Sequence, residues 1–125
     1  MTTVLIVEDD REVLTVLREL LEGSGYDAFS ATGADAVTVA ADLQPDVVLM
    51  DLVLERGLRG ETLLAQLRTQ ERTAQLRVIV TSAAGDAAHI ARRIGADDVL
   101  LKPFTIELLV HRIESVLAKN APHIA

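Results

Sequence analysis

The stretch that decides the fold is residues 46–51, which read DVVLMD. Four apolar residues run without a break between two acids, which is typical of a strand buried on both faces of a parallel sheet. A charge is costly inside such a strand, so we place Asp51 at its carboxyl end, where the chain leaves the sheet. Ligands of open α/β sheets bind at that end of the strands. Asp51 is therefore either a turn residue or a reactive carboxylate in a mouth formed by several strand ends.

Strand-like and helix-like segments alternate along the whole chain. Continuous or alternating apolar runs predict the strands, and apolar residues at helical spacing predict the helices. The expected strands are 4–7, 26–30 (an edge strand), 46–51, 78–80 and 99–101, and the expected helices are 13–21, 34–43, 61–70, 86–94 and 106–117. Five strand–helix repeats predict an α/β domain with a parallel sheet, right-handed crossovers and helices on both faces.

Composition excludes several classes of function. A chain of 125 residues suggests one domain with a real core. The formal net charge of −7 argues against nucleic acid and anionic membranes as direct partners. Because there is no cysteine, disulfides and thiolate metal sites are excluded. The sequence shows neither a signal peptide nor an apolar run long enough to span a bilayer, so we expect a cytoplasmic protein.

Polar residues follow four of the five expected strands. They are Glu8, Asp9 and Asp10 after the first strand, Asp51 after the third, Thr81 and Ser82 after the fourth, and Lys102 after the fifth. Carboxylates gathered at one sheet edge repel one another unless a cation lies among them. Only oxygen ligands are available, and they are few, which favours Mg²⁺ over Ca²⁺. A carboxylate nucleophile, Mg²⁺, an ammonium and a hydroxyl together suit phosphoryl transfer.

Three motifs together resemble the receiver domain of two-component response regulators. They are residues 4–10 (VLIVEDD), residues 46–51, and the segment that runs from GADD at 95–98 to KPF at 102–104. The resemblance covers nearly the whole chain. It implies a flavodoxin-like (βα)5 fold with strand order 2-1-3-4-5. We expect a stand-alone receiver over residues 1–120, a tail at 121–125 and no output domain.

The resemblance also implies a role for each residue of the site. Asp51 would be the phospho-acceptor, and Glu8, Asp9, Asp51 and the backbone carbonyl of Val53 would hold Mg²⁺. Lys102 would pair with the phosphoryl group, and its peptide bond to the following proline would be cis. The phosphodonor would be a sensor histidine kinase or a phosphotransfer protein.

The hydroxyl that follows the fourth strand has two candidates. The family pattern there is Pro, three aliphatic residues, a variable residue, Ser or Thr, then Ala or Gly. Residues 77–83 (RVIVTSA) fit this pattern with Ser82 as the switch hydroxyl and Arg77 in place of Pro. Thr81, the alternative, would point to the opposite face of the sheet, because side chains alternate along a strand.

Four departures from the family pattern concern the loops and the switch. Glu55 stands where the family usually has Pro, and the loop before Gly60 is one residue longer. The segment from Ser82 to Lys102 is two residues shorter. Val99 stands where an aromatic residue usually reports phosphorylation. The residues for phosphorylation are intact, so the departures bear on how the change is transmitted.

Three functions are compatible with these residues. The first is a phospho-receiver that catalyses only its own phosphorylation and dephosphorylation. It would act on a downstream protein through the face of the helix at 86–94, the strand at 99–101 and the last helix. The second is a pseudo-receiver that docks proteins without being phosphorylated. The third is a Mg²⁺-dependent phosphatase-like hydrolase. Such an enzyme needs a second acid two residues after Asp51, and that position is occupied by Val53.

Overall fold

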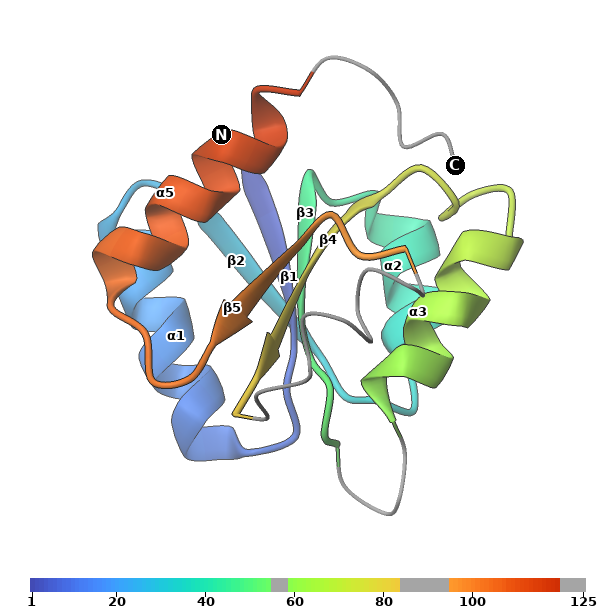
Figure 1. Ribbon diagram of the computed structural model, residues 1–125, viewed down its shortest axis with the longest axis horizontal. Coiled ribbons are helices and arrows are strands. Elements are labelled where there is room, and N and C mark those ends of the chain that lie inside the picture. Colours follow the sequence, from blue (N-terminus) through green and yellow to red (C-terminus); the bar gives the residue numbers. More distant parts are fainter. Residues whose placement is uncertain (55–58, 84–94, 120–125) are drawn as a thin grey trace.

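The computed structural model describes residues 1–54, 59–83 and 95–119, in which five strands form one sheet covered by four helices (Figure 1). The strands are β1 (Thr3–Val7), β2 (Asp27–Ala31), β3 (Val47–Asp51), β4 (Arg77–Ser82) and β5 (Asp98–Leu101). The helices are α1 (Arg11–Gly23), α2 (Ala36–Leu43), α3 (Gly60–Thr69) and α5 (Ile106–Leu117). The expected helix at 86–94, Glu55 and the tail at 121–125 lie outside the described residues.

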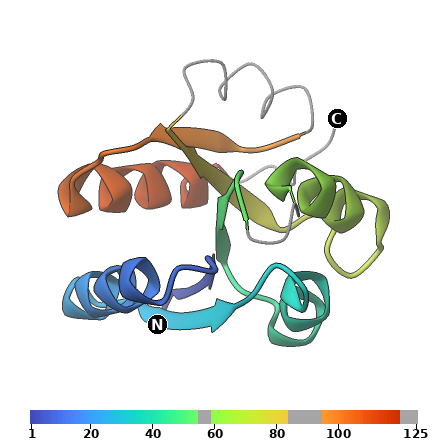
Figure 2. The same ribbon diagram turned by 90° about the horizontal axis from the view of Figure 1, so that it is seen from below.

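The sheet is parallel and its strand order is β2-β1-β3-β4-β5. This order confirms the predicted flavodoxin-like topology and the edge position of β2. Helices α1 and α5 cover one face, and α2 and α3 cover the other (Figure 2). Asp51 is the last residue of β3, as predicted, so it reaches the carboxyl edge of the sheet.

Side chains of the strands alternate between two apolar clusters. The cluster between the sheet and helices α2 and α3 includes Leu5, Val48, Val80, Leu63, Leu64 and Leu67. The cluster between the sheet and helices α1 and α5 includes Val4, Leu49, Ile79, Leu21, Leu109 and Ile113. Continuing this alternation, Asp51 and Thr81 belong to the α1/α5 face, and Ser82 belongs to the α2/α3 face.

Helix α1 has two features that its apolar spacing did not predict. Asp10, which we had grouped with the acids of the site, is the N-cap of the helix, where its Oδ1 accepts from the backbone N–H of Glu12 at 2.9 Å. The apolar spacing along α1 did not separate buried positions from exposed ones. Leu21 is fully buried, but Val13 and Leu20 are 37% and 41% exposed. One side of α1 is therefore apolar and open.

Helix α3 begins directly against the backbone that follows Asp51. The N–H of Gly60 donates to the carbonyl of Leu52 at 2.9 Å. A Cβ added to Gly60 would overlap the carbonyl oxygen of Asp51 and lie 2.8 Å from the Cα of Leu52. A residue without a side chain is therefore required where α3 meets the end of β3.

Arg68 joins α3 to the turns that precede β4 and β5. Its Nε and Nη2 donate to the carbonyl of Gly95, and Nη1 donates to the carbonyls of Ala74 and Leu76. Nη2 also bonds Asp97 Oδ2 at 3.0 Å. Burial lowers the pKa of Arg68, and the charge of Asp97 opposes that shift. The five contacts match the five N–H donors of a guanidinium and fix the start of β5.

Candidate functional site

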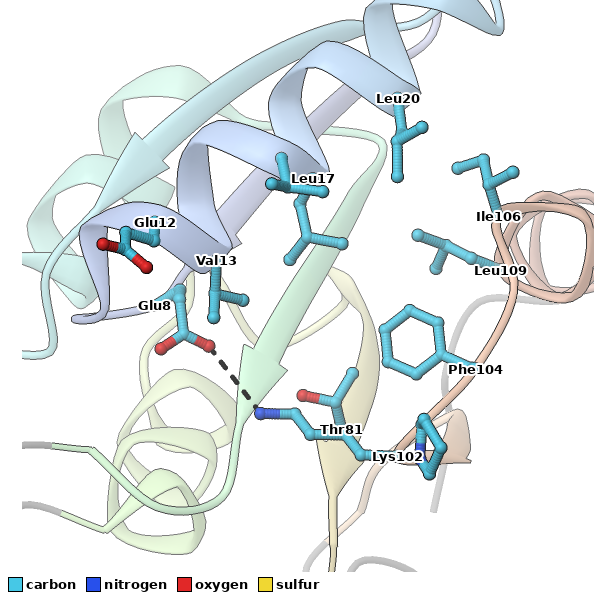
Figure 3. Close-up of a pocket in the computed structure, with 12 residues that line it drawn as sticks. Glu8, Glu12, Val13, Leu17, Leu20, Thr81, Lys102, Phe104, Ile106 and Leu109 are labelled. Atoms are coloured by element: carbon cyan, nitrogen blue, oxygen red, sulfur yellow. Dashed lines mark ion pairs between the residues drawn. The ribbon is translucent and has the colours of Figure 1, made fainter.

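Three ionisable side chains from different strand ends meet at the carboxyl edge of the sheet. Lys102 Nζ lies 2.6 Å from Asp51 Oδ2 and 3.9 Å from Glu8 Oε2. Figure 3 shows the Glu8–Lys102 ion pair at the polar end of a pocket. The predicted gathering of Glu8, Asp51 and Lys102 is therefore present, although Glu8 is separated from Asp51 by 43 positions in sequence.

Glu8 is a buried acid next to a second acid. Its side chain is about 9% exposed, and its Oε1 accepts from the N–H of Asp10 at 3.0 Å. Burial raises the pKa of Glu8; the Asp10 N–H lowers it, the charge of Asp51 raises it further, and Lys102 opposes that rise. Two acids share one ammonium, so a further cation would stabilise the ionised site.

Asp51 is held in a fixed orientation through both of its carboxylate oxygens. Oδ1 accepts from the backbone N–H of Val53 at 3.0 Å, and Oδ2 accepts from Lys102 Nζ at 2.6 Å. The residue is only 8% exposed. A short charge-assisted bond and a backbone bond together fix the side chain at the point where β3 ends.

Asp9 is bonded to a neighbouring connection of the sheet. Its Oδ1 accepts from the N–H of Gly33, in the connection between β2 and α2, at 3.1 Å. Among the described residues, no three His, Cys, Asp or Glu side chains are arranged to hold a metal ion. The donor atoms nevertheless fit Mg²⁺, because Glu8, Asp9, Asp51 and the Val53 carbonyl supply only oxygen. Asp9 would contribute a carboxylate oxygen to this set.

The two candidate hydroxyls lie on opposite faces of β4. Thr81 pairs with Asp51 in the sheet register and lines the pocket that also contains Glu8 and Lys102. Ser82 is almost fully buried, and its carbonyl accepts from the backbone N–H of Lys102 at 2.9 Å. Opposite orientation was predicted from strand alternation. Ser82 stays the predicted switch hydroxyl and Thr81 stays its alternative.

Two features of β5 and the turn after it bear on the family pattern. The Lys102–Pro103 peptide bond is cis, as predicted. Val99 is partly buried and packs against the cluster under α2 and α3. The aliphatic side chain therefore occupies the inner face of β5, on the same side of the sheet as Ser82.

The sequence did not predict a pocket of about 520 Å³ between α1 and α5. Its polar end is formed by Glu8, Glu12, Thr81 and Lys102, and its walls are formed by Val13, Val16, Leu17, Leu20, Pro103, Phe104, Ile106 and Leu109 (Figure 3). The signal that could have indicated it is the width of the apolar stripe on α1. Val13, Val16 and Leu20 extend this stripe beyond what one packed face requires.

The chain matches known proteins along most of its length. Residues 4–114 match the profile of the response regulator receiver domain. The chain is 34% identical to the DNA-binding dual master transcriptional regulator RpaA of Synechocystis sp., over 96% of the chain and 51% of that relative. It is 32% identical to the phosphate regulon transcriptional regulatory protein PhoB of Pseudomonas aeruginosa, over 96% of the chain and 53% of that relative. The chain thus spans about half the length of the curated relatives it matches.

Solved structures give the same result for the fold. A putative response regulator from Chloroflexus aurantiacus J-10-fl is 35% identical, with a TM-score of 0.87 and coverage of 94% of this chain and 98% of that one. The receiver domain of sensor histidine kinase PA1611 from Pseudomonas aeruginosa PAO1, solved with a magnesium ion coordinated in its active-site cleft, is 28% identical. Its TM-score is 0.84, with coverage of 94% and 98%. From the strand order, the acid–lysine cluster and these matches, we conclude that the chain belongs to the receiver domain family of two-component response regulators.

Proposed function

We propose that this receiver domain accepts a phosphoryl group on Asp51 from the phosphohistidine of a sensor histidine kinase or a phosphotransfer protein. A carboxylate oxygen of Asp51 forms a bond to phosphorus as the phosphorus–nitrogen bond breaks. The imidazole nitrogen leaves with the electron pair of that bond. The observation that carries the proposal is the 2.6 Å contact between Lys102 Nζ and Asp51 Oδ2.

The surroundings of Asp51 support its role as a nucleophile. Its carboxylate is oriented by the Val53 N–H and by Lys102 before any donor arrives, so little reorganisation is needed. After transfer, the Lys102 ammonium is within reach of the new phosphoryl oxygens and can balance their charge. We propose that the domain catalyses only its own phosphorylation and dephosphorylation.

We infer that Mg²⁺ is held by Glu8, Asp9, Asp51 and the backbone carbonyl of Val53. Bound there, the ion would neutralise charge on the phosphoryl oxygens during transfer. The excess of acid over base around Glu8 supports this assignment, and so does the magnesium ion in the related receiver domain. Asp9, whose Oδ1 accepts from the N–H of Gly33, would contribute a carboxylate oxygen to the ion.

Output would follow from the movement of Ser82 toward the phosphoryl group. Because Ser82 is bonded to Lys102 through the backbone, this movement would reach β5 and the face it shares with α5. A downstream protein would bind there. The relatives RpaA and PhoB are DNA-binding or transcriptional regulators, but the net charge of −7 disfavours direct contact of this domain with nucleic acid. No described helix combines the length and apolar character needed to cross a membrane. A cytoplasmic location is part of the proposal.

Intact-mass measurement with acetyl phosphate tests the proposal directly. The wild-type protein should gain the mass of one phosphoryl group with Mg²⁺ and no mass after chelation of divalent ions. Asp51→Asn should gain none. Asp42→Asn is the matched control, because Asp42 is exposed on α2, and it should label like the wild type. An undiminished gain in Asp51→Asn would place the phosphorylated residue elsewhere.

The alternative of a pseudo-receiver rests on Asp9. Its Oδ1 accepts from the N–H of Gly33, whereas Glu8 and Asp51 both lie beside Lys102. Two results together would favour the docking function. The wild-type protein would gain no phosphoryl group at saturating Mg²⁺. Mg²⁺ would also leave the thermal unfolding profile of both the wild type and Asp9→Asn unchanged.

A further inference from the structure

The connection between β2 and α2 leaves the sheet beside the acids of the site. Val7 and Ala31 pair at the ends of β1 and β2, so the residues that follow these two strands emerge side by side. A specific bond joins them, because Asp9 Oδ1 accepts from the N–H of Gly33 at 3.1 Å. A turn that is distant from Asp9 in sequence is therefore in direct contact with a proposed Mg²⁺ ligand.

Gly33 is held by a turn that closes on itself. Asp35 Oδ1 accepts from the N–H of Thr32 at 2.8 Å and from the Thr32 hydroxyl at 3.0 Å. The N–H of Asp35 donates in return to the Thr32 carbonyl at 3.3 Å. Gly33 is buried, whereas Thr32 and Asp35 are exposed. The turn at residues 32–35 thus presents a main-chain N–H to Asp9 from a backbone that these hydrogen bonds fix.

From these contacts, we propose that the turn at residues 32–35 positions Asp9 for Mg²⁺, and that Asp35 is the positioning residue of this turn. The N–H of Gly33 fixes the direction of the Asp9 carboxylate before the ion arrives. An oxygen that accepts one N–H keeps a further lone pair, so the bond to Gly33 is compatible with ligation. Partners of metal ligands orient them in this way and influence metal affinity. The inference rests on the Mg²⁺ site of the proposed function.

The advantage of a fixed carboxylate is entropic. A side chain that is free to rotate loses that freedom when it binds an ion, and a partner that has already fixed it removes this cost. Asp51 and Lys102 are oriented by other bonds, to the Val53 N–H and to each other. Loss of order at Asp9 should therefore weaken Mg²⁺ binding and leave the reactivity of Asp51 unchanged once the ion is bound.

The bonds of Asp35 also have a structural role. An acid that accepts from the N–H of the residue three positions earlier is the returning half of a capping box, which stabilises the start of a helix. That role alone predicts that loss of Asp35 lowers the free energy of unfolding and leaves the affinity for Mg²⁺ unchanged. The affinity for the ion therefore separates positioning of Asp9 from stabilisation of α2.

Addition of Mg²⁺ without a phosphodonor, followed in amide spectra, measures this affinity. In the wild type, the Gly33 amide should shift along the same saturation curve as the amides of residues 8–10. Asp35→Ala should raise the Mg²⁺ concentration at half-saturation about fivefold, less than the roughly 10–100-fold typical of losing a direct partner of a metal ligand. Asp35→Asn keeps an acceptor oxygen for Thr32 and should bind Mg²⁺ like the wild type. Both variants remove the same charge, so their difference reports the hydrogen bonds to Thr32.

Two further variants and a second readout complete the test. Thr32→Val removes the hydroxyl and keeps the N–H, so it should weaken Mg²⁺ binding only about twofold. Asp42→Ala, at an exposed position near the other end of α2, should leave the affinity unchanged. In labelling with acetyl phosphate, Asp35→Ala should need more Mg²⁺ to reach half of its maximal rate, and that maximal rate should equal the rate of the wild type.

The outcomes distinguish this inference from the proposed function. If Asp35→Ala binds Mg²⁺ as tightly as the wild type, or if Asp35→Asn is weakened as much as Asp35→Ala, the positioning role is overturned and the Mg²⁺ site stands. If Asp35→Ala does not fold, equal affinity of Thr32→Val and the wild type overturns the positioning role instead. If the wild type shows no saturable response to Mg²⁺, the site and the positioning role are both overturned.

Discussion

The two faces of the sheet are built from the same five strands but are closed to different degrees. On the α2/α3 face, Leu63, Leu64 and Leu67 are fully covered, and α3 begins in contact with the backbone of β3. On the α1/α5 face, apolar residues of α1 remain exposed around a pocket that leads to Lys102. The acids and the lysine lie on the open face, whereas the predicted switch hydroxyl, Ser82, lies on the closed one.

This difference separates two tasks. The open face leaves the reactive groups accessible to donors and ligands. On the closed face, we expect a small displacement at Ser82 to be transmitted instead of absorbed, because packed interiors have few alternative arrangements. Matched substitutions on the two faces should therefore have different effects.

The largest expected difference concerns the two hydroxyls of β4. Ser82→Ala should still gain a phosphoryl group, but the amide shifts that follow labelling of the wild type should disappear. Thr81→Val, which keeps the shape of the side chain on the open face, should retain them. The measurement is a pair of amide spectra, before and after labelling, for each variant. Loss of the response in Thr81→Val alone would move the switch to the open face.

The second prediction compares two glycines. Gly60→Ala should destabilise the protein by about 3 kcal/mol, because its Cβ would overlap the Asp51 backbone. Gly23→Ala, at the end of α1, meets nothing within 4 Å and should stabilise the protein by about 0.5 kcal/mol. Urea unfolding measures both. If Gly60→Ala costs less than about 1 kcal/mol, the contact between α3 and β3 is looser than described.

The third prediction compares two leucines. Leu64→Ala should cost about 3 kcal/mol, because it opens a cavity in the closed cluster. Leu17→Ala should cost about 1 kcal/mol, because Leu17 lines the pocket and is already partly exposed. Urea denaturation measures the free energy of unfolding of each variant. The two values can be compared if both variants show the same dependence of that free energy on urea concentration. Equal costs would mean that the α1/α5 face is closed in solution.

The smallest expected effect concerns the charge of Glu8. Because its pKa is raised, the folded protein binds this proton more tightly than the unfolded chain, and ionised Glu8 opposes folding at neutral pH. Glu8→Gln removes the charge and keeps an acceptor for the Asp10 N–H. Without divalent ions, it should raise the free energy of unfolding at pH 7 slightly.

The control for this variant is its pH dependence. Lowering the pH through the raised pKa protonates Glu8 in the wild type, so the advantage of the Gln variant should shrink there and return as the pH rises. A gain that stays constant with pH would arise from packing and not from charge. Phosphorylation of the variant should be slower, since a proposed Mg²⁺ ligand is lost.

The parts of the fold that could be predicted depend on local pattern. Apolar runs gave the strands, helical spacing gave the helices, and the resemblance gave the strand order and the residues of the cluster. Residues 46–51 alone located Asp51 at a strand end, because a charge inside a buried strand is too costly. The cap formed by Asp10 was also readable, since Asp directly before a helix is a preferred N-cap.

The parts that could not be predicted depend on contacts distant in sequence. The direction of the Asp9 side chain is set by an N–H at Gly33, on another connection of the sheet. The pocket depends on how far α1 stands from α5; the wide apolar stripe on α1 indicates that part of the helix is open, but not that distance. Nothing in the sequence around Arg68 distinguishes it from an exposed helix residue, because its partners lie up to 29 residues away.

The contacts of Arg68 also give one end of the sheet a second support. The start of β5 is held by its pairing with β4 and also from α3, through Gly95 and Asp97. The resemblance indicates that the segment from Ser82 to Lys102 is two residues shorter than the family pattern. We expect a change of length to be tolerated wherever it leaves Arg68 in contact with Gly95 and Asp97, because these contacts help to keep β5, and with it Lys102, in place.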